Sequence, residues 1–273
     1  MICSLYLGIS RGLRLRETLE KLGRGEISVD EAEKALKVDV VQKVEGIARL
    51  DVSRAIRRGI PEIILAEGKS EEDLVAICKS MLEHNRRVIV SRVSDSQIST
   101  LRRNFGVPCI FDEFRHARSV VIKQKDFVMK TTGGKVGILT AGTVDLGVAE
   151  EAQMIANEMG CLTFLEADAG VAGIHRLSEP LTRLIKNDVD CLIVVAGREG
   201  ALPTVVAGLV DIPLISVPTS SGYGYGGKGT AALMAMLQAC SLGLAVVNID
   251  SGIAAGVVAS QIANRVARAR GNR

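Results

Sequence analysis

The second half of this sequence predicts a doubly wound α/β fold, in which helices cover both faces of a parallel sheet. Five apolar segments of strand length recur there, and a segment with helical periodicity follows each one. Strands that are apolar throughout are typical of a parallel sheet buried on both faces. The expected strands are 135–140, 161–166, 191–196, 213–217 and 244–249. The expected helices are 145–159, 178–186, 201–209, 230–238 and 252 to about 268.

The first half predicts a smaller α/β domain. Charged residues are frequent before the Thr-Thr-Gly-Gly segment at 131–134, whereas short glycine-rich joints recur after it, so we divide the chain into 1–130 and 131–273. A capping box, Ser28-x-x-Glu31, opens a short helix that ends at residue 36. With a helix at 13–22, it forms a candidate docking or oligomerisation element. The other expected elements are helices at 70–83 and 94–105 and extended segments at 43–51, 61–66, 87–91 and 117–123.

Composition excludes several classes of protein. The chain has 273 residues, of which 47% are hydrophobic and 24% charged, which is the balance of an ordinary globular protein. Its net charge of only +3 does not indicate a nucleic-acid-binding surface. We interpret the arginine clusters at both ends as solvated helix faces. Aromatic residues are only 3% of the chain, so binding of a nucleic-acid polymer by base stacking is not expected.

The cysteines and the longest apolar stretch bear on the cellular compartment. Six cysteines are scattered without a C-x-x-C pair, which indicates neither a zinc site nor a disulfide framework. The apolar stretch 231–249 is interrupted by Gln238 and Gly243, so a helix followed by a buried strand fits it better than a membrane span. No cleavage site follows the mildly apolar first ten residues. We expect a cytoplasmic protein.

Unusual residues gather in the loops after the expected strands, which is where ligands bind in doubly wound sheets. The loop 218–229 contains five glycines and Lys228 directly before a helix, a pattern that favours phosphate or nucleotide binding. The spacing does not match a Walker loop, and the loop 140–145 lacks the G-x-G-x-x-G pattern. The alternative interpretation of 218–229 is a surface lid without a ligand.

Four further polar residues fall at the same expected sheet edge: Asp168, His175, Arg176 and Glu199. A carboxylate at such an edge can act as a base or hold Mg²⁺. The alternative is a purely structural role, in which the carboxylate caps a helix. For His175 the alternative is a cap or a buried, hydrogen-bonded ring. The convergence of these residues on one edge, rather than any one of them, indicates a site.

Cys240 differs from the other cysteines because it ends the helix that starts at the glycine-rich loop. The negative partial charge of a helix C-terminus disfavours a thiolate. A nucleophilic Cys240 therefore needs another stabilising group or a strong electrophile, such as a cationic ring. Three cysteines fit small core residues and Cys109 is expected to begin an apolar turn. The three are Cys78, Cys161 and Cys191.

The second half resembles the aminoimidazole ribonucleotide (AIR) carboxylase, or PurE-like, family of purine biosynthesis. The resemblance lies in Gly137-Ile-Leu-Thr-Ala-Gly, Gly173-Ile-His-Arg176, Ala196-Gly-Arg-Glu-Gly-Ala-Leu-Pro203, Val206-Ala-Gly-Leu209 and Pro213-Leu-Ile-Ser-Val-Pro218. It implies a flavodoxin-like parallel sheet, transfer of CO₂ to a ring carbon, and an octamer. Two features depart from that family: the bacterial purine enzymes are essentially the core alone, and they need no thiol at the position of Cys240.

In both of these features the chain resembles the related LarB family, the carboxylases of nickel-pincer cofactor biosynthesis. The matching N-terminal motifs are Ala48-Arg-Leu-Asp51, Arg54, Arg57-x-Gly59-x-Pro61-Glu62 and Glu67-Gly-Lys69. The matching core motifs are Pro218-Thr-Ser-x-Gly-Tyr-Gly224 and Cys240 followed by Val247-Asn-Ile-Asp250-x-Gly252. Where the family pattern has Ser then Asp in the first loop, this chain has Val144 and Asp145.

The LarB resemblance implies carboxylation of the pyridinium ring of nicotinic acid adenine dinucleotide at C5, with hydrolysis of the phosphoanhydride to release AMP. The product is pyridinium-3,5-biscarboxylic acid mononucleotide. Addition of the Cys240 thiolate at C4 makes C5 nucleophilic toward CO₂. CO₂ or bicarbonate is then the co-substrate, and Mg²⁺ at Asp168 stabilises charge on the pyrophosphate. The implied catalytic residues are Cys240, Glu199 and His175. The implied substrate-binding residues are Asp51, Arg54, Arg57, Gly142, Asp145, Arg176, Arg198, Ser220, Ser221, Gly222, Tyr223, Gly224 and Asp250.

Two alternatives stay open beside the LarB-like reading. A purine carboxylase proper would use the region of His175 for proton transfer on an imidazole ribonucleotide, without need of Cys240. A nucleotide-binding regulator would keep the fold without turnover. We favour the LarB-like reading because the first 130 residues are absent from the short purine enzymes. We expect a homo-oligomer, an octamer, with neither a membrane nor a nucleic-acid polymer as partner.

Overall fold

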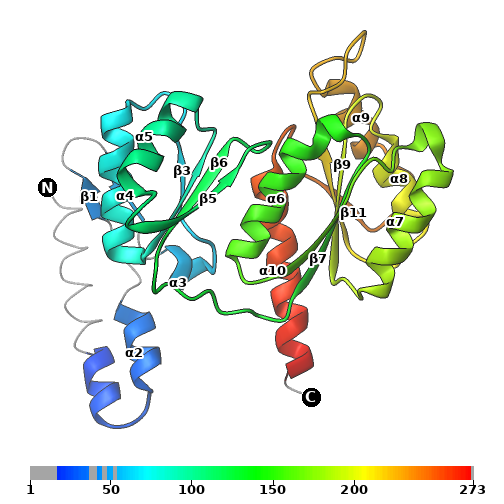
Figure 1. Cartoon of the computed structure of the whole chain (residues 1–273). Helices are drawn as coiled ribbons and strands as arrows, with labels where there is room; N and C mark the ends of the chain where they lie inside the picture. Colours follow the sequence, from blue (N-terminus) through cyan, green and yellow to red (C-terminus); the bar gives the residue numbers. More distant parts are fainter. Residues whose placement is uncertain (1–16, 37–41, 45–47, 52–53, 272–273) are drawn as a thin grey trace, which may run out of the picture.

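The computed structural model describes residues 17–36, 42–44, 48–51 and 54–271. The described residues form two large β-sheets and the two-stranded pair β1–β2, and helices α6 (Leu146–Glu158) and α10 (Gly252–Gly271) lie between the two large sheets (Figure 1). Helices α4 (Glu71–Asn85) and α5 (Asp95–Phe105) cover the outer face of the first sheet. Helices α7, α8 and α9 cover the outer face of the second. Among the described residues, no helix combines the length and apolar composition that crossing a bilayer requires.

The first sheet has the strand order β3-β4-β6-β5. Its strands are β3 (Ile63–Leu65), β4 (Arg87–Ser91), β5 (Cys109–Phe114) and β6 (Ser119–Gln124). Strands β3 and β4 are parallel, whereas β6 is antiparallel to both of its neighbours. Before this sheet come a helical segment at 17–23, α2 (Val29–Leu36), the antiparallel pair β1 (Gln42–Val44) and β2 (Ala48–Leu50), and α3 (Arg54–Arg58).

The second sheet is parallel throughout, with the order β11-β10-β9-β7-β8, which is the flavodoxin-like arrangement. Its strands are β7 (Lys135–Thr140), β8 (Leu162–Glu166), β9 (Cys191–Ala196), β10 (Leu214–Pro218) and β11 (Leu244–Val246). The short turns η2 (Thr143–Asp145) and η3 (Val171–Gly173) follow β7 and β8. The outer helices are α7 (His175–Lys186), α8 (Ala201–Ala207) and α9 (Thr230–Leu237).

Most expected elements are present, and the capping signals explain where several helices begin. The Ser28–Glu31 box forms as expected, and Ser70 and Ser94 cap α4 and α5. Residues 13–16 of the first expected helix lie outside the described residues, as do the arginines of the N-terminal cluster. The expected domain boundary at 130 falls within the segment 125–134, which joins the two sheets and holds no helix or strand.

Two expectations were wrong in detail. Cys109 begins strand β5 rather than a turn. The segment 43–51, expected to be extended, contains most of β1 and all of β2 among its described residues. The sequence pattern does not predict strand β5, because it is an edge strand whose acidic residues weaken its apolar pattern. In the structure Asp112 pairs with Lys123, and Glu113 pairs with Arg102. Helix α7 begins at His175, three residues earlier than expected, so His175 and Arg176 lie in its first turn.

Helix α6 is buried on two opposite faces. Its small residues pack on the second sheet together with the alanines of α10, while its large apolar residues pack on the first sheet. The small residues are Ala149, Ala152 and Ala156. The large residues are Met154 and Ile155, with Met159 just beyond the helix, and they contact Ile60, Ile89 and Val121. One helix therefore supplies core to both domains, which fixes how the two sheets are placed.

A buried ion cluster accompanies this apolar contact. The carboxylate of Glu158, at the end of α6, is 6% exposed and lies 2.9 Å from the guanidinium of Arg87 and 2.6 Å from the ammonium of Lys123. Arg87 also donates a hydrogen bond to the backbone oxygen of Glu158. Both cations come from the first sheet, so the cluster joins the domains through charges that water does not screen well.

Two glycines let α10 approach α6 closely. A Cβ atom on Gly256 would lie 2.6 Å from the backbone oxygen of Ala152, and one on Gly252 would overlap the backbone oxygen of Val148. Neither position has room for a side chain. The first turn of α10 is consequently held against the start of α6, beside Glu151.

We predict that Glu158→Gln lowers the free energy of unfolding by about 3 kcal/mol, because Arg87 would stay largely buried without a counter-charge and Lys123 would keep only the half-exposed Asp112. Urea denaturation measures the change. The control is Glu179→Gln, whose carboxylate is 84% exposed and pairs with Arg183, and which should cost less than about 0.5 kcal/mol. Equal losses for the two variants would contradict the importance of the buried cluster.

Candidate active site

The loops that follow β7, β9, β10 and β11 meet at the carboxyl edge of the second sheet, and Asp145 holds two of them together. Its carboxylate is 2% exposed and accepts hydrogen bonds from the hydroxyls of Thr219 (2.7 Å) and Ser221 (3.0 Å). Its other oxygen accepts from the amide of Gly142 at 3.1 Å. Asp145 and Ser221, both expected to bind substrate, are therefore bound to each other and fix the shape of the edge.

A second pair of contacts fixes the same loops. The carboxylate of Asp250 accepts a hydrogen bond from the amide of Ser220 at 2.8 Å, which ties the loop after β11 to the loop after β10. Gly197 lies so close to Ser221 that a Cβ atom there would overlap the hydroxyl. These contacts bring the expected residues Gly142, Asp145, Ser220, Ser221 and Asp250 together.

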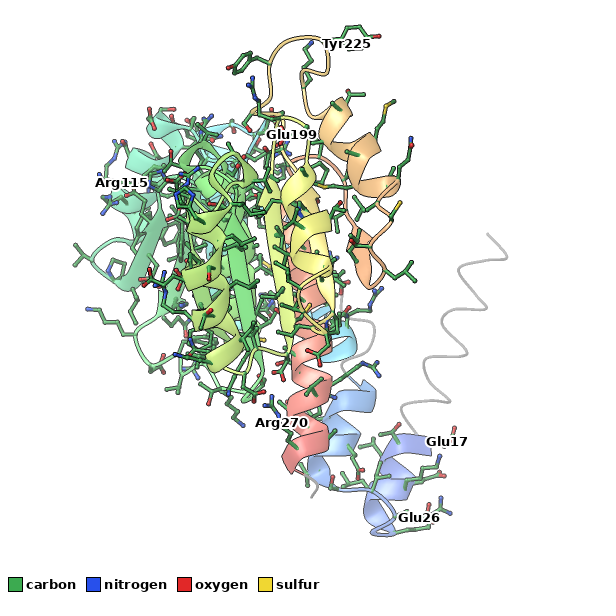
Figure 2. The ribbon with its side chains drawn as sticks, turned by 90° about the vertical axis from the view of Figure 1, so that its right-hand side faces the viewer. Glu17, Glu26, Arg115, Glu199, Tyr225 and Arg270 are labelled. Carbon is green, nitrogen blue, oxygen red and sulfur yellow. The ribbon has the colours of Figure 1, made fainter. Side chains whose placement is uncertain are left out.

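The glycine-rich loop projects outward from this edge, with Tyr225 near its tip (Figure 2). The guanidinium of Arg198 lies 4.1 Å from the centre of the Tyr223 ring. Gly222 packs against the backbone of Arg198, and Gly224 has a φ of 82°, which favours glycine. The first amides of α9 are already used, since Thr230 and Ala231 donate to carbonyls of Gly227 and Gly226. The expected phosphate site at this helix N-terminus stays a prediction.

The remaining residues expected at this edge are exposed. Asp168 pairs with Arg176 at 2.8 Å, and His175 lies on the first turn of α7. Glu199 follows β9 at the base of the projecting loop, and no described residue pairs with its carboxylate (Figure 2). It is therefore available to a ligand.

The described residues do not by themselves form a complete protein cage for a magnesium ion. They contain no group of three His, Cys, Asp or Glu side chains that could surround a metal. The carboxylate of Asp168 is neutralised by Arg176, which competes with a cation for the same oxygens. We therefore assign no step of the chemistry to a metal, and Mg²⁺ at Asp168 stays a prediction.

Cys240 lies apart from these loops within one chain. Helix α9 starts at the carboxyl edge and runs back along the sheet, and Gly243, just after Cys240, pairs with Leu214 at the start of β10. The neighbouring Ser241 donates a hydrogen bond to the backbone oxygen of Thr204 in α8. Glu199 precedes the seven residues of α8, a length of ~10 Å, so it and Cys240 lie near opposite ends of that helix.

The N-terminal residues expected at the site lie elsewhere. Arg54 is in α3 and pairs with Glu62 at 3.2 Å, just before β3 begins. Asp51 precedes α3, and the side chain of Arg57 lies outside what the structure describes. This group is at the amino end of β3, opposite the end whose loop lines the cleft described next. Its expected role at the site stays a prediction.

The first domain instead contributes other residues to a cleft of about 860 Å³ between the domains. One wall consists of the loops after β3 and β4 and the tip of the β5–β6 hairpin. The other consists of the start of α6 and the loops after β10 and β11. The polar residues of the lining are Glu67, Arg92, Ser94, Gln97, His116, Arg118, Glu151, Thr219, Ser220, Ser221 and Asp250.

Sequence reasoning missed four of the titratable residues of this cleft: Arg92, His116, Arg118 and Glu151. Arg92 directly follows β4, so the rule that ligands meet the carboxyl ends of parallel strands could have found it. The others carry no comparable signal. His116 and Arg118 belong to a turn of a hairpin whose first strand was not recognised, and Glu151 reads as an ordinary exposed position of a helix.

Glu151 has an altered proton affinity. Burial raises the pKa of its carboxyl group to about 7, the nearby charge of Asp250 adds to the increase, and Arg92 and the amide of Ile253 oppose it. A carboxyl group with such a pKa can take up or release a proton near neutral pH.

Comparison with known proteins decides the family. A family model described as the LarB/PurE-like N-terminal domain matches residues 41–124, and one described as AIR carboxylase matches residues 135–270. An uncharacterized protein of Methanocaldococcus jannaschii is 42% identical over 254 residues, which are 92% of this chain and 98% of that protein. The chain belongs to the LarB family. This LarB-family chain has a PurE-like, carboxylase-type core behind its N-terminal domain.

A second relative matches less than half of the LarB-family chain. The N5-carboxyaminoimidazole ribonucleotide mutase of the same organism is 34% identical over 127 residues, which are 46% of this chain and 76% of the mutase. The cleft described above lies between the core and the N-terminal domain of the LarB-family chain.

We predict that Asp145→Asn lowers the free energy of unfolding by about 2 kcal/mol, because an amide replaces a buried carboxylate that accepts three hydrogen bonds. Hydrogen–deuterium exchange should become faster at 219–222. The exposed Asp211 provides the control, since Asp211→Asn should change neither quantity. Unchanged exchange at 219–222 in Asp145→Asn would show that Asp145 does not hold the loop.

Proposed function

We propose that this LarB-family chain carboxylates the pyridinium ring of nicotinic acid adenine dinucleotide at C5 and hydrolyses its phosphoanhydride. The products are pyridinium-3,5-biscarboxylic acid mononucleotide and AMP, and the reaction is the first step of nickel-pincer cofactor biosynthesis. The family supports carboxylation as the reaction class. A cleft of about 860 Å³ beside the sheet edge is at the upper end of the ~300–1,000 Å³ typical of small-molecule sites, which suits a dinucleotide.

The observation that carries the proposal is the exposure of the Cys240 thiol. Of the five cysteines that the structure describes, three are buried, Cys109 is half-buried and Cys240 is exposed. Burial raises the pKa of the other four thiols, to about 12 for Cys78 and Cys191. A thiolate, not a thiol, is the nucleophile, so Cys240 is the described cysteine that can attack an electrophilic ring.

The chemistry requires a nucleophile because a pyridinium ring is too electron-poor to attack CO₂. The Cys240 thiolate forms a bond to C4, and the ring electrons move to make a dihydropyridine with a nucleophilic C5. C5 then bonds to CO₂, a base removes the C5 proton, and the C4–S bond breaks to restore the aromatic pyridinium. One proton leaves for each CO₂ added, and no oxidant or reductant is needed.

Glu199 is our candidate for the base that removes the C5 proton. Its carboxylate is exposed at the sheet edge and is not used by any described side chain. His175 is the second candidate, on the exposed first turn of α7. The loop 220–224 and Arg198 would hold the substrate beside them, with bicarbonate or CO₂ as the co-substrate.

Because Cys240 and Glu199 lie near opposite ends of α8, we propose that the site is shared between copies of the chain. Apolar side chains are exposed around Cys240: Leu209 at the end of α8, Met234 and Leu237 on α9, and Leu242, which is 90% exposed. A surface of this kind normally packs against a partner. We propose a homo-oligomer, an octamer, in which Cys240 of one copy meets the sheet edge of another.

AIR carboxylation is the alternative function that a specific observation favours. The AIR carboxylase model matches residues 135–270, which are the core without the N-terminal domain. The mutase is 34% identical over 46% of this chain. A reaction on an imidazole ribonucleotide would not need a thiol, since that ring is electron-rich, so Cys240 distinguishes the two functions.

We predict that Cys240→Ala abolishes formation of the carboxylated mononucleotide from nicotinic acid adenine dinucleotide and bicarbonate, because C5 is then never made nucleophilic. Mass spectrometry of the products measures the loss. Cys109→Ala, which changes a half-buried thiol of the first domain, should keep the activity. Retained AIR carboxylation in Cys240→Ala, with no product from the dinucleotide even in the wild type, would favour the alternative function.

We predict that two inactive variants restore each other's activity if they assemble together. Subunits with Cys240→Ala and subunits with Glu199→Gln are each inactive alone. In a mixed oligomer, about a quarter of the shared sites would combine an intact thiol with an intact carboxylate, so carboxylation should return to that level. A mixture that stays inactive after co-expression, with mixed assemblies verified by mass spectrometry, would place both residues in one chain.

A further inference from the structure

The cleft between the domains contains basic side chains that the proposed carboxylation does not use. The Nε of Arg118 donates to the backbone oxygen of Val93 at 3.3 Å, and no described carboxylate pairs with its guanidinium. His116 is likewise exposed, without a described partner. Arg92 pairs with Glu67 at 3.2 Å, but both side chains are more than half exposed, so this pair is easily exchanged for a ligand.

Three of the eight described non-glycine residues with a positive φ line the same cleft. Arg92, Arg118 and Asp250 have φ values of 54°, 46° and 54°, in the left-handed region that favours glycine. Each such residue costs of the order of 1 kcal/mol, and strain of this kind clusters at functional sites. All three have long or charged side chains, and all three line the cleft. The fold therefore holds these three side chains in the cleft at the cost of this backbone strain.

The carboxyl group of Glu151 lies within the cleft, between the charged walls. The amide of Ile253 in the first turn of α10 donates to it, and Arg92 and Asp250 are the charged groups nearest to it. Gly252 leaves the space that this side chain occupies, because a Cβ atom there would lie 2.8 Å from the Cβ of Glu151. The position of the carboxyl group is thus fixed by the close contact of α6 and α10.

The lining also limits what the ligand can be. No phenylalanine or tyrosine is among the described residues of the lining, so a base would find no aromatic ring to stack on apart from His116. Arginine and imidazole side chains together with serine and threonine hydroxyls are the groups that bind phosphate. The cleft therefore suits the phosphates and ribose of a nucleotide better than its base.

We propose that the cleft binds the phosphoanhydride of a dinucleotide and that Glu151 is the base for its hydrolysis. This inference rests on the proposed function and extends it to the first domain. Arg118 and His116 contact the phosphates. A water oxygen bonds to one phosphorus, the bond from that phosphorus to the bridging oxygen breaks, and Glu151 takes the proton of the water. Both halves leave as phosphate monoesters, one of them AMP.

Binding is tested first, with ADP as the probe and isothermal titration calorimetry of the full chain as the measurement. Arg118→Gln should weaken ADP binding at least tenfold, because it removes a charge that contacts phosphate. The matched control is Arg115→Gln, in the same turn, whose side chain points outward and pairs with Glu113 (Figure 2). It should bind ADP as the wild type does. Equal affinity of the two variants, or no binding of ADP by the wild type, would overturn the assignment of the cleft.

Hydrolysis is tested with Glu151→Gln, which keeps an oxygen to accept the Ile253 amide but cannot take up a proton. Release of AMP from nicotinic acid adenine dinucleotide should fall about 100-fold, the usual contribution of a general base. In the wild type the rate should rise with pH through about 7, as Glu151 loses its proton, and this rise should be absent from the variant. Glu83→Gln is the control, since Glu83 is exposed on α4 and lies outside the lining.

Formation of the Cys240 adduct separates the two proposals. Intact-protein mass spectrometry should detect the adduct in Glu151→Gln, which shows that the variant folds and binds the dinucleotide. Release of AMP by Glu151→Gln at the wild-type rate would overturn the role of Glu151 and leave the proposed function standing. Absence of adduct and carboxylated product in the wild type would overturn the proposed function, while ADP binding would still decide the assignment of the cleft.

Discussion

The double burial of helix α6 is the constraint on which the rest of the molecule depends. An amphipathic helix normally covers one sheet, whereas α6 presents alanines to the second sheet and methionine and isoleucine side chains to the first. The buried carboxylate of Glu158 fixes the same contact through two cations of the first sheet. Apolar packing supplies the area of this interface, and the ion cluster makes it specific, because a shifted arrangement would leave buried charges unpaired.

This contact positions the cleft. Because β3 and β4 are parallel and their carboxyl ends face the start of α6, the loops after them lie opposite the loops after β10 and β11. The tip of the β5–β6 hairpin rests on the same helix through the hydrogen bond from Ala117 to Glu150. Both domains thus contribute the loops at strand ends to a single space, which extends the general rule for ligand sites in parallel sheets across two domains.

The second sheet could be predicted from the sequence because its strands are apolar throughout and its helices are short and well marked. The first sheet was harder to predict, since β5 carries Asp112 and Glu113 and its signal depends on partners that the sequence does not show. For the site, Asp145, Ser220, Ser221 and Asp250 lie in the post-strand loops that the sequence singled out, and the structure brings them into contact in two pairs. Their expected role in substrate binding stays a prediction. Arg118 and Glu151 could not be predicted, because their importance arises only when the two domains meet.

The face of α6 that packs on the first sheet limits which sequences can form this core without the first domain. Met154, Ile155 and Met159 are completely or almost completely covered here, and the cover is supplied by Ile60, Ile89 and Val121. A chain that ended its fold at the second sheet would expose this apolar stripe and an unpaired Glu158 to water. An isolated core would then need polar residues along this side of the helix to stay soluble. The residue types at these positions therefore distinguish a core that stands alone from one that packs on a first domain.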